Sequence, residues 1–375
     1  MIRKLEVKGL NNRVDGAWEF NQDLNIITGR NGSGKTTLLK LIWYLTSGNL
    51  GRIIPEILFQ SVSVESNFFS LFITRVEPDK GKLEYQFADE RKSDMNIGAP
   101  WRRSDDERIY RLNQRIAETI NSSVFFPTYR RIEGGFTRFS RDMVAGDSVR
   151  YQPDRFRRRL VDRPTEMLQE AMLRLSADVS TADNHKFIAS ISTDDIVELL
   201  TEKYADVSSK TNDLHVKLSE DITARISKRK PRSHAKPVLD DIQKRVEQVT
   251  KERESLNRPF SVLSDRIRAI FHDKKIHVTA GVTLGEAKEA IESDKLSGGE
   301  KQMLSFLCYN IFSENAAIFI DEPELSLHVD WQRRLLPTLL EQGTGNQFFI
   351  ATHSPFIYAK YPDKEIQLSE DRGGD

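Results

Sequence analysis

Apolar and polar positions at the start of the chain follow patterns that predict strands and one helix. "IRKLEVKGL" alternates apolar and polar residues, and "LNIITG" is a short apolar run that leads directly into a glycine. "TTLLKLIWYLTSG" then carries apolar residues at helical spacing and ends at Gly48. "FFSLFITRV" and "KLEYQFA" predict an antiparallel hairpin with its turn at Asp79 to Gly81. The first hundred residues are therefore expected to form a mixed α/β lobe.

The middle of the chain, from about Arg155 to Phe271, has a polar and helical pattern with few strand signals. One apolar stripe repeats every four residues, at Leu214, Leu218, Ile222 and Ile226. A second stripe continues the helical spacing from Leu239 to Leu256, until Pro259 interrupts it. The basic stretch "SKRKPRSHAKP" separates the two stripes. The pattern predicts a helical hairpin with a basic tip and arms of about 19 residues, roughly 28 Å long.

The end of the chain returns to an α/β pattern. "AAIFIDE" and "QFFIATH" are continuous apolar runs of the kind found in buried parallel strands, and "WQRRLLPTLLEQG" between them predicts a crossover helix. The two ends of the sequence are therefore expected to form one α/β domain that a helical insertion interrupts. We expect its first part at residues 1–150, the insertion at 151–275 and its second part at 276–375.

The composition of the chain indicates a globular protein with no net charge. Of the 375 residues, 38% are hydrophobic and 30% are charged, which is typical of a globular protein with much solvated helix surface. Lys plus Arg and Asp plus Glu both number 56, so any binding to nucleic acid must come from local basic patches. No apolar stretch approaches the ~18 residues of a membrane span, and we expect a cytoplasmic protein. The single cysteine, Cys308, is expected to be a small buried hydrophobe.

"GRNGSGKT", Gly29 to Thr36, matches the phosphate-loop pattern of a glycine, four residues and Gly-Lys-Thr. An ordinary glycine-rich turn is the alternative, but a predicted strand before the loop and a predicted helix after it favour phosphate binding. Lys35 would place a cation between the β and γ phosphates, and the Thr36 hydroxyl would hold Mg²⁺. The expected nucleotide contacts in this segment are Gly29, Arg30, Asn31, Gly32, Ser33, Gly34, Lys35, Thr36 and Thr37.

Two further motifs supply candidate catalytic groups. Asp321, at the end of "AIFID", could position the metal ion, and the adjacent Glu322 could orient or deprotonate the attacking water. Carboxylates after a strand often cap the next helix instead, but the phosphate loop favours a catalytic assignment. His353, in "ATHSP", could donate a hydrogen bond to the γ phosphate. A lone histidine of this kind is more often structural, yet its place after the acidic strand favours function. We expect Lys35, Glu322 and His353 to be catalytic.

"LSGGEKQML" places Ser297, Gly298 and Gly299 at a helix start, where unpaired N–H groups attract phosphate. This stretch resembles the signature motif of ATP-binding cassette (ABC) proteins, in which two copies meet head to tail and each signature closes on the ATP of the other copy. "DEPELSLH" and "ATHSP" resemble the acidic strand end, crossing loop and switch histidine of that family. The resemblance covers roughly residues 1–45 and 290–358. It implies an ABC-type P-loop ATPase domain with a mixed sheet and an antiparallel β lobe.

The same resemblance assigns further roles and cofactors. It implies ATP and Mg²⁺ as cofactors, with Thr36 and Asp321 on the metal ion, and it implies a homo-oligomer. Ser326 and His328 would lie in the crossing loop, although transporter relatives usually have Asp in place of His328. No clear glutamine follows the first lobe. "FFPTYRRIEGG" occupies that region, and Tyr129, Arg130 or Arg131 is a candidate for the position.

The long helical interval is unlike a transporter subunit. "DEPELSLH" and "ATHSPFIYAKYPDKEI" resemble stand-alone ATPases related to the chromosome-maintenance, recombination-mediator and overcoming-lysogenization-defect families, including ATPase subunits of Septu-type and PARIS-type anti-phage systems. We expect an ATP-driven switch that controls a separate effector, a nuclease or a toxin. The alternative is a DNA repair or recombination ATPase that acts directly on DNA. "RFRRRLVDR" and "SKRKPRSHAK" could contact DNA or a protein partner, or could be solvated surface.

Overall fold

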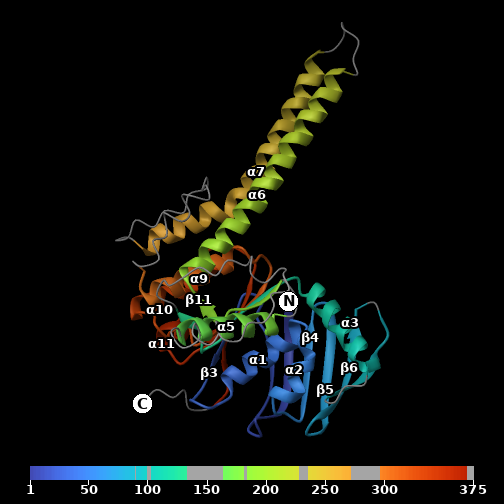
Figure 1. Ribbon diagram of the computed structural model, residues 1–375, viewed down its shortest axis with the longest axis vertical. Coiled ribbons are helices and arrows are strands. Elements are labelled where there is room, and N and C mark those ends of the chain that lie inside the picture. Colours follow the sequence, from blue (N-terminus) through green and yellow to red (C-terminus); the bar gives the residue numbers. More distant parts are fainter. Residues whose placement is uncertain are drawn as a thin grey trace, which may run out of the picture. The chain divides into compact units, whose positions relative to one another are not determined.

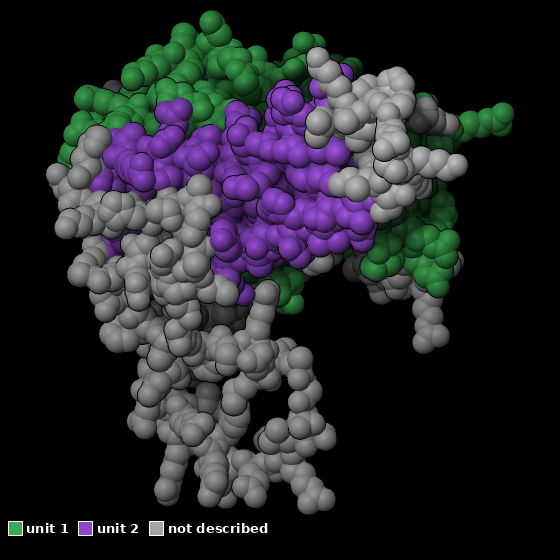
Figure 2. Space-filling model, turned by 90° about the horizontal axis from the view of Figure 1, so that it is seen from above, with its two compact units in different colours: residues 1–192, 297–375 green, residues 193–296 purple. Residues whose placement is uncertain are grey.

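The computed structural model describes residues 1–88, 90–98, 103–132, 164–180, 184–227, 235–271 and 296–369. The chain divides into two compact units, which Figure 2 shows in different colours. Unit 1 contains residues 1–192 and 297–375, and unit 2 contains residues 193–296. Unit 1 is thus built from both ends of the sequence. The predicted boundaries of the insertion, near residues 150 and 275, fall outside the described residues, so those boundaries stay a prediction.

One sheet of unit 1 is antiparallel, with the strand order β2-β1-β4-β5-β6-β7 (Figure 1). Its strands are β1 Ile2–Leu10, β2 Val14–Glu19, β4 Ser61–Ser66, β5 Phe69–Glu77, β6 Lys80–Phe87 and β7 Ser93–Gly98. In β1, residues 5, 7 and 9 are buried and residues 6 and 8 are exposed, which follows the predicted apolar-polar alternation. The predicted hairpin of β5 and β6 is confirmed, but Glu77 pairs with Lys80, so the turn holds Pro78 and Asp79.

The second sheet is parallel, with the strand order β10-β8-β12-β13-β3-β14. Its strands are β3 Leu24–Thr28, β8 Ser123–Phe126, β10 His185–Phe187, β12 Ala317–Asp321, β13 Gln347–Ala351 and β14 Glu365–Gln367. Every residue of β3, β12 and β13 is buried, which explains their continuous apolar runs. Because β12 and β3 both pair with β13 in parallel, the carboxyl ends of the three strands lie at one edge of the sheet.

The helices of unit 1 connect and cover these sheets (Figure 1). They are α1 Lys35–Thr46, α2 Leu50–Glu56, α3 Arg103–Thr119, α5 Pro164–Val179, α9 Gly298–Ile311, α10 Val329–Leu340, α11 Pro355–Tyr358 and the 3₁₀ turn Pro362–Lys364. Helix α1 contributes Trp43 and its apolar neighbours to a core shared with the antiparallel sheet. These side chains of α1 are almost entirely buried. Cys308 on α9 is buried, as predicted. The core therefore fixes α1, and with it the loop that precedes α1.

Several short strands were missing from the prediction. β8 belongs to the parallel sheet and has four residues, β10 has three, and β11 Ser190–Ile191 pairs with β9 Arg131–Ile132 in a separate two-stranded sheet. Segments of two to four residues are too short to show a period, and their pairing with distant strands creates them. The middle of the chain, predicted to be helical with few strand signals, thus contains two short strands within residues 185–191.

Unit 2 is a helical hairpin in its described part, formed by α6 Thr193–Ser227 and α7 Ala235–Ile270. The predicted arm length of about 19 residues was wrong, because the helices have 35 and 36 residues, or about 52 Å each. The apolar stripes used for the prediction cover only part of the seam. Tyr204 packs edge-on against Phe260, with ring centroids 6.0 Å apart, beyond the predicted arms.

The sequence pattern suggested that Pro259 interrupts the second helix, but the helix continues past it. Helix α7 continues to Ile270 with Pro259 inside it. Figure 1 shows that α7 changes direction in its C-terminal part, drawn in orange. A proline inside a helix removes one backbone hydrogen bond and commonly produces such a bend.

Among the described residues, no helix combines the length and the apolar character that crossing a bilayer requires.

Candidate nucleotide site

The phosphate loop lies between β3 and α1, at the carboxyl edge of the parallel sheet. Gly34 is the N-cap of α1 and has a φ of 96°, a left-handed conformation that side chains rarely adopt. Glycine at this position lets the loop turn directly into the helix, so that the N–H groups of the first turn of α1 point out of the helix end. Such a helix start attracts anions, above all phosphate. The backbone therefore supports the predicted phosphate loop.

Flanking segments hold other residues of the loop. The Arg30 N–H donates to Ser369 Oγ at 3.0 Å, and Asn11 Nδ2 donates to Thr37 Oγ1 at 3.1 Å. Ser369 follows β14, and Asn11 lies in the turn between β1 and β2. The sequence motif gave no sign of either contact. Both partners come from segments that tertiary structure alone brings to the loop.

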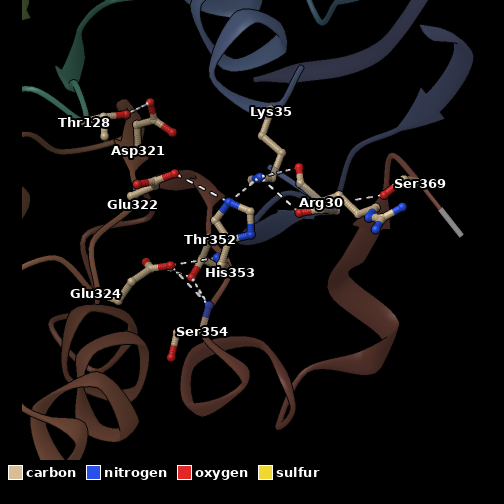
Figure 3. Close-up of polar contacts among 11 residues, drawn as sticks. Arg30, Lys35, Thr128, Asp321, Glu322, Glu324, Thr352, His353, Ser354 and Ser369 are labelled. Atoms are coloured by element: carbon tan, nitrogen blue, oxygen red, sulfur yellow. Dashed lines mark hydrogen bonds and ion pairs between the residues drawn. The ribbon is translucent and has the colours of Figure 1, made fainter. Parts of the chain in front are cut away.

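Lys35 is 5% exposed, and its amine is enclosed by hydrogen-bond partners (Figure 3). Nζ donates to Gly29 O at 3.0 Å and to Arg30 O at 3.1 Å, and it lies 2.6 Å from His353 Nε2. Beside an ammonium group, this histidine nitrogen accepts a hydrogen bond, so its ring is neutral. Burial lowers the pKa of Lys35, against the opposing effect of nearby carboxylates.

Asp321 is the fully buried last residue of β12. Oδ2 accepts a hydrogen bond from the Thr128 hydroxyl, whereas Oδ1 has no hydrogen-bond partner. Burial raises the pKa of Asp321, and the hydroxyls of Thr128 and Thr36 act to lower it. A buried carboxylate oxygen without a partner, beside the Thr36 hydroxyl, has the chemistry of a Mg²⁺ ligand set. The residues predicted for the metal ion therefore fit it.

Glu322 follows at the strand end, with a φ of 45° that is uncommon for a residue other than glycine. Its N–H donates to Ala351 O at 2.8 Å, and its Oε1 lies 3.5 Å from His353 Nε2. Burial is the main cause that raises the pKa of Glu322, followed by repulsion from Asp321 and Glu324. A carboxylate with a raised pKa is suited to take a proton from water near neutral pH.

Glu324 organises the loop that carries the histidine. It accepts hydrogen bonds from Thr352 Oγ1 at 2.8 Å, His353 N at 2.7 Å and Ser354 N at 3.1 Å. Figure 3 shows these contacts below the His353 ring, which faces Lys35 and Glu322. Burial, followed by Lys35, holds the pKa of His353 below its ordinary value. The prediction overlooked Glu324, although "DEPE" contains it as a third carboxylate.

Arg130 lies in the segment where a family glutamine was sought. It is 8% exposed, and it donates hydrogen bonds to Asp321 O and Glu322 O and to the side chain of Gln302. Burial lowers its pKa to about 10, in opposition to Asp321, Glu324 and Glu322. Tyr129, another candidate, is 89% exposed. The Arg130 side chain thus bonds to the acidic strand end.

The signature stretch forms the start of α9, as predicted. Ser297 is the N-cap, and its side chain and that of Glu300 bond reciprocally to each other's backbone N–H. A Cβ on Gly299 would collide with Ser326 O, so α9 begins directly against the loop before α10. Among the described residues, Ser297, Gly298 and Gly299 make no hydrogen bond to the phosphate loop of their own chain. Within one chain, the signature residues and the phosphate loop are therefore not linked by a hydrogen bond among the described residues.

The predicted crossing loop is the segment between β12 and α10. Ser326 has a positive φ of 70°, and His328 is the N-cap of α10, with Nδ1 accepting from Asp330 N at 3.4 Å. An Asp would cap a helix in the same way, so His328 retains the capping role that the family residue could serve. The predicted role of the two residues at a dimer interface stays a prediction.

Residues 24–359 match the protein family described as "AAA domain, putative AbiEii toxin, Type IV TA system". Among curated proteins, the Retron Vc95 probable ATPase of Vibrio cholerae is 24% identical over 92% of this chain and 69% of its own length. The Retron Ec83 probable ATPase of Escherichia coli is 24% identical over 45% of the chain, and Endonuclease GajA of Bacillus cereus is 41% identical over 15%. The chain spans only 34% and 11% of those two relatives.

Solved structures give weaker similarities. The Smc head domain of Pyrococcus furiosus aligns with 99% of the chain and 94% of its own length, at 16% identity and a TM-score of 0.39. The recombination mediator RecF aligns with 93% and 91%, at 13% identity and a TM-score of 0.31. At these low scores, the assignment rests on the family match and on the sheets and site described above. The chain belongs to the AAA-domain family with the AbiEii description, and it is a P-loop ATPase of that family.

Proposed function

We propose that this chain is an ATP-hydrolysing switch of ABC type, which dimerises on ATP and controls a separate effector, a nuclease or a toxin, in anti-phage defence. The observation that carries the catalytic part is the unpartnered, buried Oδ1 of Asp321, within one site that also holds Lys35, Glu322 and His353. An unsatisfied buried carboxylate oxygen is costly unless a cation or donor completes it. Mg²⁺ bound with ATP would complete it.

Each site residue has a defined task in this proposal. When bound, ATP with Mg²⁺ supplies the phosphoryl group and the cation that neutralises its charge. Lys35 would exchange its bonds to Gly29 O, Arg30 O and His353 for bonds to phosphate oxygens, and Thr36 and Asp321 would hold the metal ion. Glu322 orients the attacking water and accepts its proton. His353, once released from Lys35, would donate a ring N–H to the terminal phosphate.

Two copies of the chain are proposed to share each site. Ser297, Gly298 and Gly299 present a helix start that makes no hydrogen bond to the phosphate loop of the same chain. A helix start of this kind is suited to bind an anion from outside. In the proposed dimer, the anion is the ATP on the phosphate loop of the second copy. ATP would then stabilise the dimer, because it contacts both chains.

The proposal of a separate effector rests on the names of the relatives. Two are probable ATPases of retrons, one is an endonuclease, and the family description mentions a toxin. In this proposal, the ATP-dependent assembly of the chain controls the activity of a nuclease or toxin on another polypeptide. The basic stretches at residues 155–163 and 227–236 lie wholly or largely outside the described residues, and DNA contact through them stays a prediction.

The test is an affinity purification of tagged Glu322→Gln from its native host with ATP present, followed by identification of bound protein and nucleic acid. Glu322→Gln is expected to bind ATP and hydrolyse it about 10²- to 10⁴-fold more slowly, which holds the assembled state. Lys35→Ala, which is expected to lose ATP binding, is the matched control. A nuclease or toxin recovered in stoichiometric amount with Glu322→Gln supports the proposal. DNA recovered without a protein partner would instead indicate a repair ATPase.

A further inference from the structure

Two side chains, Arg130 and Gln302, donate hydrogen bonds to backbone carbonyl groups in the segment that follows β12. Arg130 Nη1 donates to Asp321 O at 2.8 Å, and its Nη2 donates to Glu322 O at 3.2 Å. Gln302 Nε2 donates to Pro323 O at 2.8 Å and to Leu325 O at 2.9 Å. The two side chains therefore hold the segment on both sides of the Glu322 side chain.

Arg130 and Gln302 are also bonded to each other. Arg130 Nε donates to Gln302 Oε1 at 3.3 Å, and Arg130 Nη1 donates to Pro127 O at 2.8 Å. The Arg130 guanidinium lies 5.4 Å from the centre of the Phe306 ring on α9. Gln302 is fully buried and Arg130 nearly so, which strengthens each bond and makes the loss of any partner costly. The two residues form one connected clamp.

Glu322 needs such support, because its own backbone is not in a relaxed conformation. A φ of 45° in a glutamate is maintained only where surrounding contacts determine it. The Glu322 N–H is held from one side by Ala351 O, and its carbonyl is held from the other side by Arg130. Displacement of a catalytic group by about 1 Å can cost roughly 10²-fold in rate. The orientation of the Glu322 carboxylate therefore depends on the clamp.

We infer that Arg130 and Gln302 are positioning residues for Glu322, and that through Gln302 they tie the first turns of α9 to the catalytic strand end. The inference rests on the proposed ATPase function for its kinetic part. Gln302 lies one turn after Gly299, on the helix that begins with the signature stretch. A shift of this helix start, when a second chain binds its nucleotide, is thereby transmitted to Glu322 of the same chain.

Two substitutions remove the clamp without removing a group that contacts nucleotide. Arg130→Lys keeps the charge but loses the fork that reaches three backbone carbonyls and Gln302 at once. Gln302→Met keeps the length of the side chain but loses all three hydrogen bonds. Each variant is expected to lower kcat at least about tenfold while the affinity for ATP stays within about threefold. This separation of kcat from binding differs from what general destabilisation produces.

Gln342→Met is the matched control for a buried glutamine. Gln342 is 2% exposed and also bonds to α9, through Nε2 to Leu307 O at 3.2 Å. Its other partner is Asn310, and neither bond reaches residues 321–325. Gln342→Met is expected to lower the melting temperature as much as Gln302→Met and to leave kcat unchanged. An equal loss of kcat in both variants would show a merely structural effect and overturn the inference.

A second measurement asks whether the clamp acts through Glu322. In the Glu322→Gln background, Arg130→Lys is expected to slow the residual hydrolysis less than about twofold, because residues that act as a unit are not additive. The same tenfold loss in both backgrounds would show that Arg130 acts by another route and would overturn the inference.

Hydrogen exchange of the nucleotide-free protein tests the clamp without hydrolysis. The N–H groups of Glu322, Leu325 and Leu327 bond within or beside the clamped segment. Their exchange is expected to be about tenfold faster in Arg130→Lys and Gln302→Met, and unchanged in Gln342→Met. Unchanged exchange in the clamp variants contradicts the inference while leaving the proposed function intact. A wild-type chain that binds and hydrolyses no ATP contradicts the proposed function, together with the kinetic part of the inference.

Discussion

Glu322 shows at the scale of one residue how catalysis and stability oppose each other. Burial and two neighbouring carboxylates raise its pKa in the nucleotide-free protein. A carboxylate whose pKa is higher in the folded state than in the unfolded state destabilises the fold at pH values above that folded pKa. The penalty disappears below the unfolded value of about 4.5, where the group is protonated in both states. The catalytic carboxylate is therefore expected to reduce stability at neutral pH.

This argument predicts the effect of Glu322→Gln on thermal stability. The variant is expected to melt at a higher temperature than the wild type at pH 7 to 8, because it removes an ionised group from a crowded acidic site. The difference should shrink as the pH falls through the raised pKa of folded Glu322 towards the unfolded value of about 4.5. Calorimetry of both proteins without nucleotide measures it. A difference in melting temperature that stays constant with pH would show that the ionised Glu322 carboxylate does not destabilise the fold.

At the scale of elements, the start of α9 and the loop before α10 fit together only because residue 299 has no side chain. A Cβ on Gly299 would collide with Ser326 O, and backbone cannot move aside as a flexible side chain can. A Cβ on the adjacent Gly298 would meet only Ile132 Cγ2, at an ordinary contact distance of 3.5 Å. The two glycines thus have different structural requirements although they are neighbours in one motif.

Substitution of each glycine by alanine tests this difference. Gly299→Ala is expected to destabilise the protein by about 1–3 kcal/mol, as overpacking does, and to lower the melting temperature by a few degrees. Gly298→Ala is expected to leave the melting temperature unchanged or to raise it slightly, because alanine is the better helix former. Thermal unfolding of both variants gives the comparison. Equal melting temperatures would mean that α9 does not begin against Ser326.

Prediction of elements from the sequence succeeded where the surroundings of a segment are uniform along its length. The runs that became β3, β12 and β13 are buried on both faces, so their pattern needs no partner to be recognised. β8 was missed because its four residues acquire strand structure only between β10 and β12. The helix arms were underestimated because the prediction used only the stripes at residues 214–226 and 239–256. Most of the buried apolar residues of the hairpin lie outside those stripes, among them Leu200, Phe260 and Leu263.

At the scale of the whole molecule, the proposed dimer distributes each site over two chains. Lys35 and Glu322 belong to one chain's half of a site, whereas Ser297 completes the site of the other chain. Lys35→Ala and Ser297→Arg are each expected to be inactive alone. A mixed dimer of the two variants contains one site in which both halves are intact. Mixing the two proteins should therefore restore hydrolysis.

The restoration is measured as phosphate release across a series of mixing ratios, with a maximum expected near equal amounts. Lys35→Ala mixed with Glu322→Gln is the control, because these two residues lie in the same half-site and no mixed dimer contains an intact site. Activity in the control mixture, or none in the test mixture, would contradict the shared site. Light scattering of Glu322→Gln with ATP checks independently that a dimer forms.

The sequence by itself determined the phosphate loop, the acidic strand end, the histidine after β13 and the helix start at Ser297. Local chemistry suffices for these, because glycine spacing and short apolar strands specify a loop and a strand end without distant partners. Tertiary structure alone decided that Glu324 holds the histidine loop and that Arg130 and Gln302 hold Glu322. The contacts of Arg130 with Gln302 and Glu322 join residues that are 172 and 192 positions apart. Only the packing of the two chain ends into one unit brings them within hydrogen-bonding distance.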